Sequence, residues 1–375
     1  MLPKWSRHGT LDQALHNNVM TGSPRRAETS SAENIDALIS EARGKHANPV
    51  FISAEQTERV FDWGAAIDCM EATYAGELDD ALSPPRVVAR GNDVWFRALA
   101  AVSPNRHLMG AKLFGLGRGR GTTYLVALFD QESGELRVLM DAKHLTAVRT
   151  AATSAVAVKY LVQPEADLVA TILGSGTEGQ THARALATAC RIGRANVYSP
   201  TVANREAFAK SFTEETGVPC QAISDPAEGV RHSDLVVAAA RSFDETPILL
   251  GAWLRPGTTV VSIGSTLPEQ REIDPDCVEF ASVIVADMPE EVSDQTGDML
   301  NASEAGIRFE NKLISLSDLV RGTELGRRSD DDIVMYKSVG AAVQDIAIAE
   351  LCYLNALESG DYAEMPFELS KKFMT

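Results

Sequence analysis

The feature that most constrains the fold is a glycine-rich turn in the middle of the chain, GSGTEG at residues 174–179. It follows the apolar run LVATIL and precedes HARALATA, a helix-like stretch of small residues. In a GxGxxG pattern the glycines permit a tight turn, allow a pyrophosphate to approach the backbone, and let the helix pack closely on the strand. The sequence therefore predicts a dinucleotide-binding β–turn–α unit.

The pattern around this turn predicts a Rossmann domain over residues 166–329. Short apolar strands such as ANVYSP, DLVVAAA and TTVVSIG follow the first one, and helical patterns lie between the early strands. Strands that alternate with helices are typical of a parallel, doubly wound sheet. The fold class expected is therefore α/β in this part of the chain.

The half of the chain before the turn has a different pattern. From Phe51 the chain resembles a strand end followed by a capped amphipathic helix. After it come the strand candidates RVVAR, DVWFRALAAV, HLMGAKLFGL, TTYLVALFD and ELRVLMD, with short turns between them. Such a series predicts a mainly antiparallel sheet. A mostly apolar helix near the C-terminus must be covered by this sheet or by a second subunit. We therefore predict an α+β substrate-binding and dimerisation domain over residues 49–165 plus 330–375.

Composition excludes several classes of partner. The chain of 375 residues has 35 basic and 52 acidic residues and a net charge of -17, which disfavours nucleic acid and anionic membranes. No apolar run approaches the ~20 residues of a membrane helix, and the N-terminus lacks the apolar core of a secretory signal. Residues 1–48 are polar and irregular, and are predicted to be a flexible extension.

The cysteines and histidines carry no metal or disulfide signature. Five cysteines are scattered without a CxxC pair, and the seven histidines lack metal-binding spacing. We expect a cytoplasmic protein with reduced thiols and no metal.

The second Rossmann strand ends without the acidic residue that usually binds the ribose of NAD. Ser199 and Thr201 stand there, and Arg205 follows nearby. Hydroxyls and a guanidinium favour NADP(H), while NAD(H) remains possible. The predicted cofactor-binding residues are Thr150, Gly174, Ser175, Gly176, Thr177, Glu178, Gly179, Gln180, Ser199, Thr201, Arg205, Ser242, Gly264, Ser265, Thr266 and Lys337. Lys337 and Asp345 interrupt an apolar pattern, which favours a structural ion pair for each and leaves a place at the active site as the other role.

Three cations are candidates for substrate binding. With Thr146 as N-cap, Arg149 falls in the first turn of a helix, where a cation is unfavourable unless an anion lies nearby. Lys112 has apolar or glycine neighbours, and desolvation would lower its pKa toward the range useful for proton transfer. Arg86 follows two prolines. Each has an alternative role. Arg149 would be a surface or ion-paired arginine, Lys112 would extend its ammonium to water, and Arg86 would be an ordinary charge at the end of a strand.

Taken together, these motifs resemble the ornithine cyclodeaminase/mu-crystallin family. The stretches that carry the resemblance are PPR at 84–86, GAK at 110–112, LTAVRTAATSA at 145–155, GSGTEGQ at 174–180, REID at 271–274 and KSVGAAVQD at 337–345. The resemblance implies a homodimer with a nicotinamide cofactor. It also implies that Arg86, Lys112 and Arg149 bind the substrate carboxylate, with Lys112 catalytic and with Thr123 on the next strand touching the substrate.

One departure from the family bears on which activity the chain has. Cyclodeaminases of this family have an aspartate where this sequence has Thr266, in GST. The resemblance therefore favours an NAD(P)H-dependent oxidoreductase that reduces an imine of an α-keto acid, as a ketimine reductase does, or oxidises an α-amino acid. The alternatives are cyclisation of ornithine to proline and ammonia with catalytic NAD, and a non-catalytic NADP-dependent binding protein.

Overall fold

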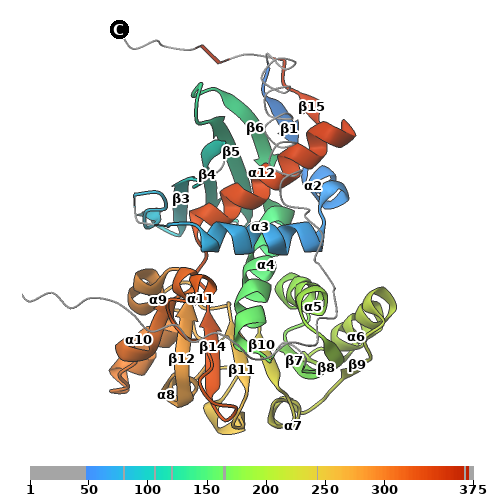
Figure 1. Ribbon diagram of the computed structural model, residues 1–375, viewed down its shortest axis with the longest axis vertical. Helices are drawn as coiled ribbons and strands as arrows, with labels where there is room; N and C mark the ends of the chain where they lie inside the picture. The colour runs from blue at the N-terminus through green and yellow to red at the C-terminus, as the bar shows by residue number, and fades with distance from the viewer. Residues whose placement is uncertain are drawn as a thin grey trace, which may run out of the picture.

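The computed structural model describes residues 48–78, 81–104, 107–119, 121–163, 166–242, 244–366 and 369–370. The extension predicted for residues 1–48 lies outside them, apart from its last residue. The described residues form an upper and a lower lobe, each built on one β-sheet (Figure 1). No helix in these ranges is long and apolar enough to cross a membrane.

The upper lobe contains a seven-stranded sheet of order β15-β1-β6-β5-β4-β3-β2. Its strands are β1 (Val50–Ile52), β2 (Val87–Gly91), β3 (Val94–Val102), β4 (Leu108–Leu116), β5 (Thr122–Asp130), β6 (Leu136–Asp141) and β15 (Ala363–Glu364). Every pair of neighbouring strands is antiparallel except the pair formed by β1 and β6, which is parallel. The mainly antiparallel sheet predicted from the sequence is confirmed.

Helices cover one face of this sheet. They are α2 (Ala54–Val60), α3 (Trp63–Ala75), α4 (Lys143–Leu161) and α12 (Ala342–Ser359). The single helix expected after Phe51 is two helices, because Asp62 caps a new helix by accepting a hydrogen bond from the Ala65 amide at 2.8 Å. The C-terminal helix α12 returns to pack on β3, β4 and β5, so the upper lobe supplies the cover that its apolar sequence requires.

The lower lobe contains an eight-stranded parallel sheet of order β13-β12-β14-β11-β10-β7-β8-β9. Its strands are β7 (Leu168–Leu173), β8 (Ile192–Tyr198), β9 (Cys220–Ala222), β10 (Leu235–Ala238), β11 (Thr259–Ser262), β12 (Ala281–Ala286), β13 (Leu313–Ser315) and β14 (Ile333–Lys337). The strand order reverses between β7 and β10, which is the Rossmann switch point where ligands bind.

Helices flank both faces of the parallel sheet (Figure 1). They are α5 (Thr177–Ala189), α6 (Val202–Thr216), α7 (Pro226–Arg231), α8 (Pro275–Phe280), α9 (Pro289–Gln295), α10 (Gly297–Glu304) and α11 (Leu316–Arg321), with short 3₁₀ turns at Gly251–Trp253 and Glu310–Lys312. The predicted boundary near residue 330 is wrong in one respect. It assigned β14 to the other domain, whereas β14 lies between β11 and β12 because its apolar residues need cover on both faces.

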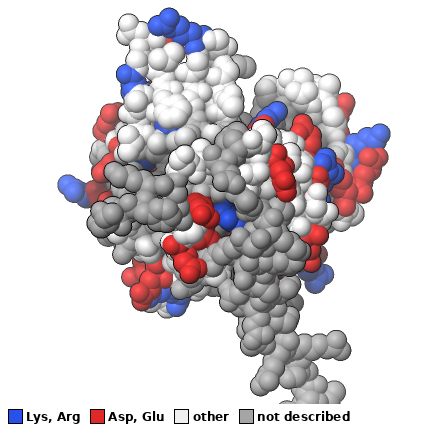
Figure 2. Space-filling model, turned by 90° about the horizontal axis from the view of Figure 1, so that it is seen from above, with Lys and Arg blue, Asp and Glu red and all other residues white. Residues whose placement is uncertain are grey.

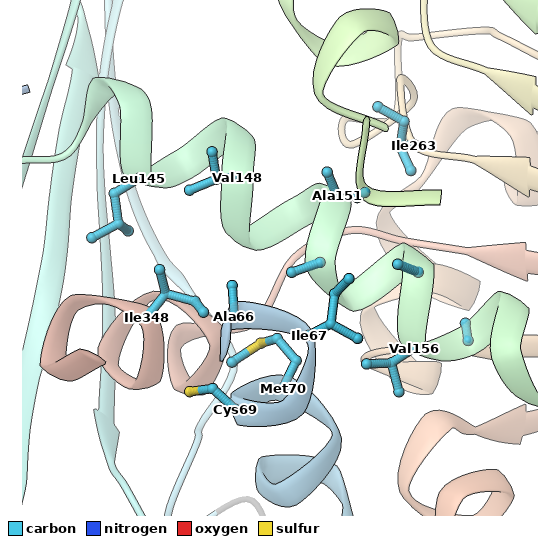
Figure 3. Close-up of a cluster of buried hydrophobic side chains, with 14 of the residues drawn as sticks. Ala66, Ile67, Cys69, Met70, Leu145, Val148, Ala151, Val156, Ile263 and Ile348 are labelled. Carbon is cyan, nitrogen blue, oxygen red and sulfur yellow. The ribbon is translucent and has the colours of Figure 1, made fainter. Parts of the chain in front are cut away.

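Helix α4 joins the two lobes. It packs on α3 and α12 above and on α5, β11 and β14 below. Figure 3 shows Leu145, Val148, Ala151 and Val156 along α4, with Ile67 and Met70 of α3 beside them, Ile348 of α12 near the Leu145 end and Ile263 on the side of Ala151. One continuous hydrophobic core therefore runs through both lobes.

The face of the upper sheet that points away from α12 is apolar. Phe96 and Val102 on β3, and Val87 on β2, are 50%, 36% and 69% exposed. They alternate with buried residues because successive side chains of a strand point to opposite faces. In the view from above, a broad area with few charged side chains occupies the upper part of the picture (Figure 2).

Candidate active site

A cavity of about 390 Å³ opens between the two lobes. Residues from β3, β4, β5 and α4 line it on one side, and the carboxyl ends of the parallel strands line it on the other. The lining residues are Arg86, Arg97, Leu99, Lys112, Phe114, Tyr124, Thr146, Arg149, Thr150, Glu178, Ala239, Ala240, Arg241, Ile263, Gly264, Thr266, Gln270, Ser338, Val339 and Gly340.

The glycine turn borders this cavity and has the geometry that its spacing predicts. Gly174 has φ +127°, and a Cβ there would lie 2.7 Å from the Ala239 carbonyl oxygen on the neighbouring strand end. A Cβ on Gly179 would lie 2.1 Å from the Gly174 carbonyl oxygen, so only glycine lets α5 start this close to β7. At Gly176 a Cβ would meet no atom within 4 Å. The first and third glycines are required by packing, and the second leaves open space.

These features fit a dinucleotide. The open space at Gly176 lies at the N-terminus of α5, where free amides and the helix dipole favour a pyrophosphate. Ser175 and Thr177 flank Gly176 in this turn, and the Gln180 amide donates to the Ser175 carbonyl at 3.0 Å and stiffens the loop. Ser175 and Gln180 also line a second cavity of about 280 Å³ between α5 and α6.

The end of β8 carries the residues proposed to distinguish the two nicotinamide cofactors. Ser199 is buried and Thr201 is the exposed residue before α6. The guanidinium of Arg205 donates to the Ser199 carbonyl at 2.9 Å, which holds a cation beside the strand end. Because no carboxylate stands at Ser199, Pro200 or Thr201, this strand end would not repel a phosphate.

Lys112 and Arg149 share one carboxylate on the upper side of the cavity. The Lys112 ammonium and the Arg149 Nε lie 2.9 and 3.0 Å from the same oxygen of Asp345, and Arg149 also donates to Gln344 at 2.5 Å. All four side chains are buried. Burial, reinforced by the charge of Arg149, lowers the pKa of Lys112 to about 8, although Asp345 opposes this. For Arg149, burial also favours the neutral form, but Asp345 and Asp287 outweigh it and its pKa is raised.

Arg86 is held by the lower lobe. Its Nε donates to Glu291 at 2.6 Å, and its Nη2 donates to the carbonyls of Val339 and Gly340 at 2.9 and 2.7 Å. Gly340 has φ +85°, and a Cβ there would lie 2.6 Å from Nη1 of Arg149. The segment before α12 therefore brings the two guanidinium groups to the same cavity.

Glu178 is the acidic residue that lines this cavity. The side chain is 39% exposed, but its Oε2 is buried without a hydrogen-bond partner. Burial raises the pKa of the carboxyl to about 7 against the attraction of Arg149 and Lys112. His182, one turn later, is fully buried, and desolvation lowers its pKa to about 4. It lies 3.8 Å from Glu178 Oε2, so a neutral imidazole stands behind this carboxyl.

Comparison with known proteins assigns the chain to a family. The model of the ornithine cyclodeaminase/mu-crystallin family matches residues 48–360. The chain belongs to this family. The resemblance predicted from the six sequence stretches is therefore confirmed.

Individual relatives are similar over most of their length. The chain is 31% identical to a Δ1-pyrroline-2-carboxylate reductase of Bacillus cereus over 288 residues, which cover 76% of this chain and 85% of that one. It is 28% identical to the ketimine reductase mu-crystallin of Mus musculus, over 81% of this chain and 96% of that one. The Δ1-pyrroline-2-carboxylate reductase of Thermococcus litoralis, solved with NADH and L-proline, matches with a TM-score of 0.78 at 25% identity, over 84% of this chain and 100% of that one.

The structure brings many, but not all, of the predicted site residues to the cavity of this family member. Arg86, Lys112, Arg149, Thr150, Glu178, Gly264 and Thr266 line it. Thr123 does not, because it is exposed on the opposite face of β5. Its neighbour Tyr124 lies opposite Phe114 on the face shared with Lys112 and lines the cavity instead. The prediction was off by one residue, which in a strand reverses the face.

Three predicted cofactor residues point elsewhere. Lys337 is fully buried in an ion pair with Asp298 at 2.8 Å, so the alternative considered for it holds. Ser265 is fully buried and donates to the Gln270 carbonyl at 3.0 Å. The hydroxyl of Ser242 donates to the Thr246 carbonyl at 2.6 Å, and Ser242 does not line the cavity.

The capping argument for Arg149 is also corrected. Helix α4 begins at Lys143 and Thr146 is not its N-cap, because the Thr146 hydroxyl donates to the Ala142 carbonyl at 2.7 Å inside the helix. Arg149 therefore lies in the second turn, and the carboxylate of Asp345 is the anion that balances its charge.

Sequence reasoning missed several residues of the site. Arg97 lines the cavity from β3, and the alternation of VWFRALA already placed it on the same face as Leu99 and Ala101. Asp287 accepts hydrogen bonds from Ser338 and from the Gly340 amide at 2.6 and 2.8 Å, and so fixes the segment that holds Arg86. Gln270 gave no sequence signal because it lies in an irregular loop.

Proposed function

We propose that this protein is an NAD(P)H-dependent oxidoreductase that reduces an imine of an α-keto acid, or in reverse oxidises an α-amino acid. The observation that carries the proposal is that Lys112, Arg86 and Arg149 line the same cavity as the carboxyl ends of the Rossmann strands. The similarity to two imine reductases supports the reaction class.

The residues of the chain perform two tasks in this reaction. The free donors of Arg86 and Arg149 bind the substrate carboxylate, because guanidinium groups match carboxylates in charge and geometry. The Lys112 ammonium, with a pKa of about 8, gives its proton to the substrate nitrogen as the carbon is reduced. Asp345 fixes the position of the ammonium through the 2.9 Å contact.

A bound nicotinamide cofactor would supply the hydride, and the residues present fit it. The turn from Gly174 to Gly179 would hold its pyrophosphate, and Thr150, Gly264 and Thr266 line the cavity near it. Arg205, held at the end of β8, favours NADP(H) over NAD(H). Comparison of KM for the two cofactors tests this preference, and the variant Arg205→Gln is expected to weaken NADPH selectively.

The second candidate is cyclisation of ornithine to proline and ammonia. It keeps the same cations, but Thr266 brings a hydroxyl to the cavity where cyclodeaminases of the family have an aspartate. A third candidate, binding of NADP without catalysis, does not use the buried Lys112 of lowered pKa. The oxidoreductase therefore uses more of the observed site than either alternative.

The deciding assay measures oxidation of NADPH and NADH with cyclic ketimines and with α-keto acids plus ammonia or methylamine. Turnover that depends on the carbonyl compound is expected. Ammonia release from ornithine in the presence of NAD+, with neither net reduction nor net oxidation of the cofactor, would instead establish the cyclodeaminase. Tight cofactor binding without any turnover would establish the binding protein.

We also propose a homodimer formed through the apolar outer face of the upper sheet. Phe96, Val102 and Val87 present an exposed apolar surface that single-chain packing leaves uncovered. Light scattering after size exclusion is expected to give about twice the chain mass of 40.4 kDa. The variant Phe96→Glu should shift the protein to the monomer, and a monomeric wild type would refute the proposal.

A further inference from the structure

Arg97 is an additional cation in the cavity, beyond the three cations assigned above. It lies on β3 opposite Phe114 of β4, and its neighbour on the same face, Leu99, lies opposite Lys112. The side chain is only 5% exposed. Its guanidinium carbon lies 4.8 Å from the ring centroid of Trp95 and 5.8 Å from that of Phe114. Two aromatic rings therefore hold this group at the cavity wall.

Arg97 differs from the other cations in lacking a partner. Lys112 and Arg149 contact Asp345, and Arg86 contacts Glu291. Within the described ranges Arg97 makes no ion pair, and its buried Nε has no hydrogen-bond partner. Burial and the charges of Arg86 and Arg90 lower the pKa of Arg97 to about 10, although Glu269 and Glu291 partly offset this. A buried, unpaired guanidinium is costly unless a ligand completes it.

The balance of charge in the cavity indicates what that ligand carries. Asp345 neutralises one of the two charges on Lys112 and Arg149, and Glu291 neutralises Arg86. Asp287 also acts on Arg149, so this pair has nearby carboxylates of the protein and offers its free hydrogen-bond donors to the carboxylate of an α-imino acid. Glu178 also faces that pair, since its carboxyl interacts with Arg149 and Lys112. The charge of Arg97 is then left without an anion.

We propose that Arg97 binds a second anionic group of the substrate, so that the enzyme prefers α-imino and α-keto acids with a further carboxylate. This inference depends on the proposed function for its reaction and on the unpaired guanidinium for its specificity. The rings of Trp95 and Phe114 keep the guanidinium in place before the ligand arrives, which reduces the entropy lost on binding.

The test compares keto acids of equal length with one and with two carboxylates. With NADPH or NADH and ammonia, kcat/KM is measured for 2-oxovalerate against 2-oxoglutarate, and for 2-oxobutyrate against oxaloacetate. We expect the wild type to prefer a dicarboxylate. The variant Arg97→Gln should lose about 10- to 100-fold on the dicarboxylate, as for a charged hydrogen bond, and less than about 3-fold on the monocarboxylate. Arg97→Lys should retain part of the preference.

The matched control is Arg194→Gln, which removes the same charge from an exposed position on β8 that does not line the cavity. It should leave the preference unchanged. Equal use of both acids by the wild type, an equal loss on both in Arg97→Gln, or a loss confined to cofactor KM would overturn the inference.

A binding measurement separates this inference from the proposed function. The shift in the thermal unfolding midpoint caused by 2-oxoglutarate or 2-oxovalerate, with NADPH present, needs no turnover. A shift by 2-oxoglutarate that disappears in Arg97→Gln supports the second anion site even if no substrate is reduced. An identical shift in wild type and variant refutes it even if turnover is found.

Discussion

At the scale of single residues, the site depends on cations whose charges are only partly balanced. Lys112 shares Asp345 with Arg149, so replacing Lys112 leaves the carboxylate paired and the fold intact. We therefore expect Lys112→Met to fold normally but to lose about 10² to 10⁴ in kcat, the usual contribution of a proton donor. Circular dichroism checks the fold, and steady-state kinetics check the loss. A variant that keeps wild-type kcat would exclude Lys112 as the donor.

The pH dependence of the wild type should report the same group. Lys112 must carry its proton in order to donate it, and its pKa is lowered to about 8. The rate of imine reduction is therefore expected to fall as the pH rises through about 8. In Lys112→Met this limb of the profile of kcat/KM should be absent, because no ammonium remains to titrate.

Glu178 should make stability depend on pH in a defined direction. Burial raises its pKa from 4.5 to about 7, so the folded chain keeps a proton that the unfolded chain releases between these values. Its contribution to the free energy of unfolding decreases as the pH rises from about 4.5 to 7 and is constant above. The variant Glu178→Gln should therefore gain stability relative to wild type over this window, as measured by urea unfolding at several pH values. The exposed Glu206→Gln serves as the control, and a constant difference for Glu178→Gln would contradict the assignment.

At the scale of elements, the three glycines of the turn should behave differently. Gly179→Ala places a Cβ 2.1 Å from the Gly174 carbonyl oxygen and should separate α5 from β7, lowering stability. Gly176→Ala meets no atom within 4 Å and should unfold like the wild type, yet bind NAD(P)H less tightly because the methyl group occupies the pyrophosphate space. Denaturant unfolding and cofactor titration distinguish the two. Equal cofactor affinity in Gly176→Ala would place the pyrophosphate elsewhere.

The end of the parallel sheet contains a buried ion pair that should act on stability. Lys337 and Asp298 are both fully buried and contact each other at 2.8 Å. Removing one partner leaves an unpaired buried charge, so Lys337→Met should cost about 3–5 kcal/mol of unfolding free energy. The double variant Lys337→Met with Asp298→Asn should recover part of it, whereas the exposed Lys210→Met should be neutral. If Lys337→Met lowers cofactor affinity without lowering stability, Lys337 binds the cofactor as the sequence predicted.

The elements themselves were largely predictable from the sequence, and the reasons are local. Alternating apolar residues identified the strands from Val87 to Asp141, and the glycine spacing identified the β7–α5 turn. The errors arose where a single residue of register or a tertiary partner decides the outcome. Thr123 faces away because a strand alternates, and the role of Lys337 depended on Asp298, which lies 39 residues away in the sequence. The alternation of β3 places Arg97 on the inward face of the strand, but only the structure shows that this face lines the cavity.

At the scale of the whole molecule, the continuous core predicts cooperative unfolding. One hydrophobic cluster contains Val126 of the upper sheet, Val156 of α4 and Val261 of the lower sheet. We expect a single thermal transition in which the near-ultraviolet signals of Trp95 in the upper lobe and Trp253 in the lower lobe change together. Because the chain also contains Trp5 and Trp63, the signal of each lobe is taken as the difference between the wild type and Trp95→Phe or Trp253→Phe. Two separate midpoints would show that the lobes unfold independently.

Helix α4 has a consequence for how ligands influence distant parts of the chain. The same rigid rod supplies Arg149 and Thr150 to the cavity and packs against sheets in both lobes. Binding of a nucleotide at the parallel sheet is therefore expected to stabilise the upper sheet as well, although the nucleotide does not contact that sheet. Saturation with NADPH should slow amide hydrogen exchange in β4 and β5 as well as in β7. Cofactor binding to the lower lobe would then reduce local opening of the upper lobe.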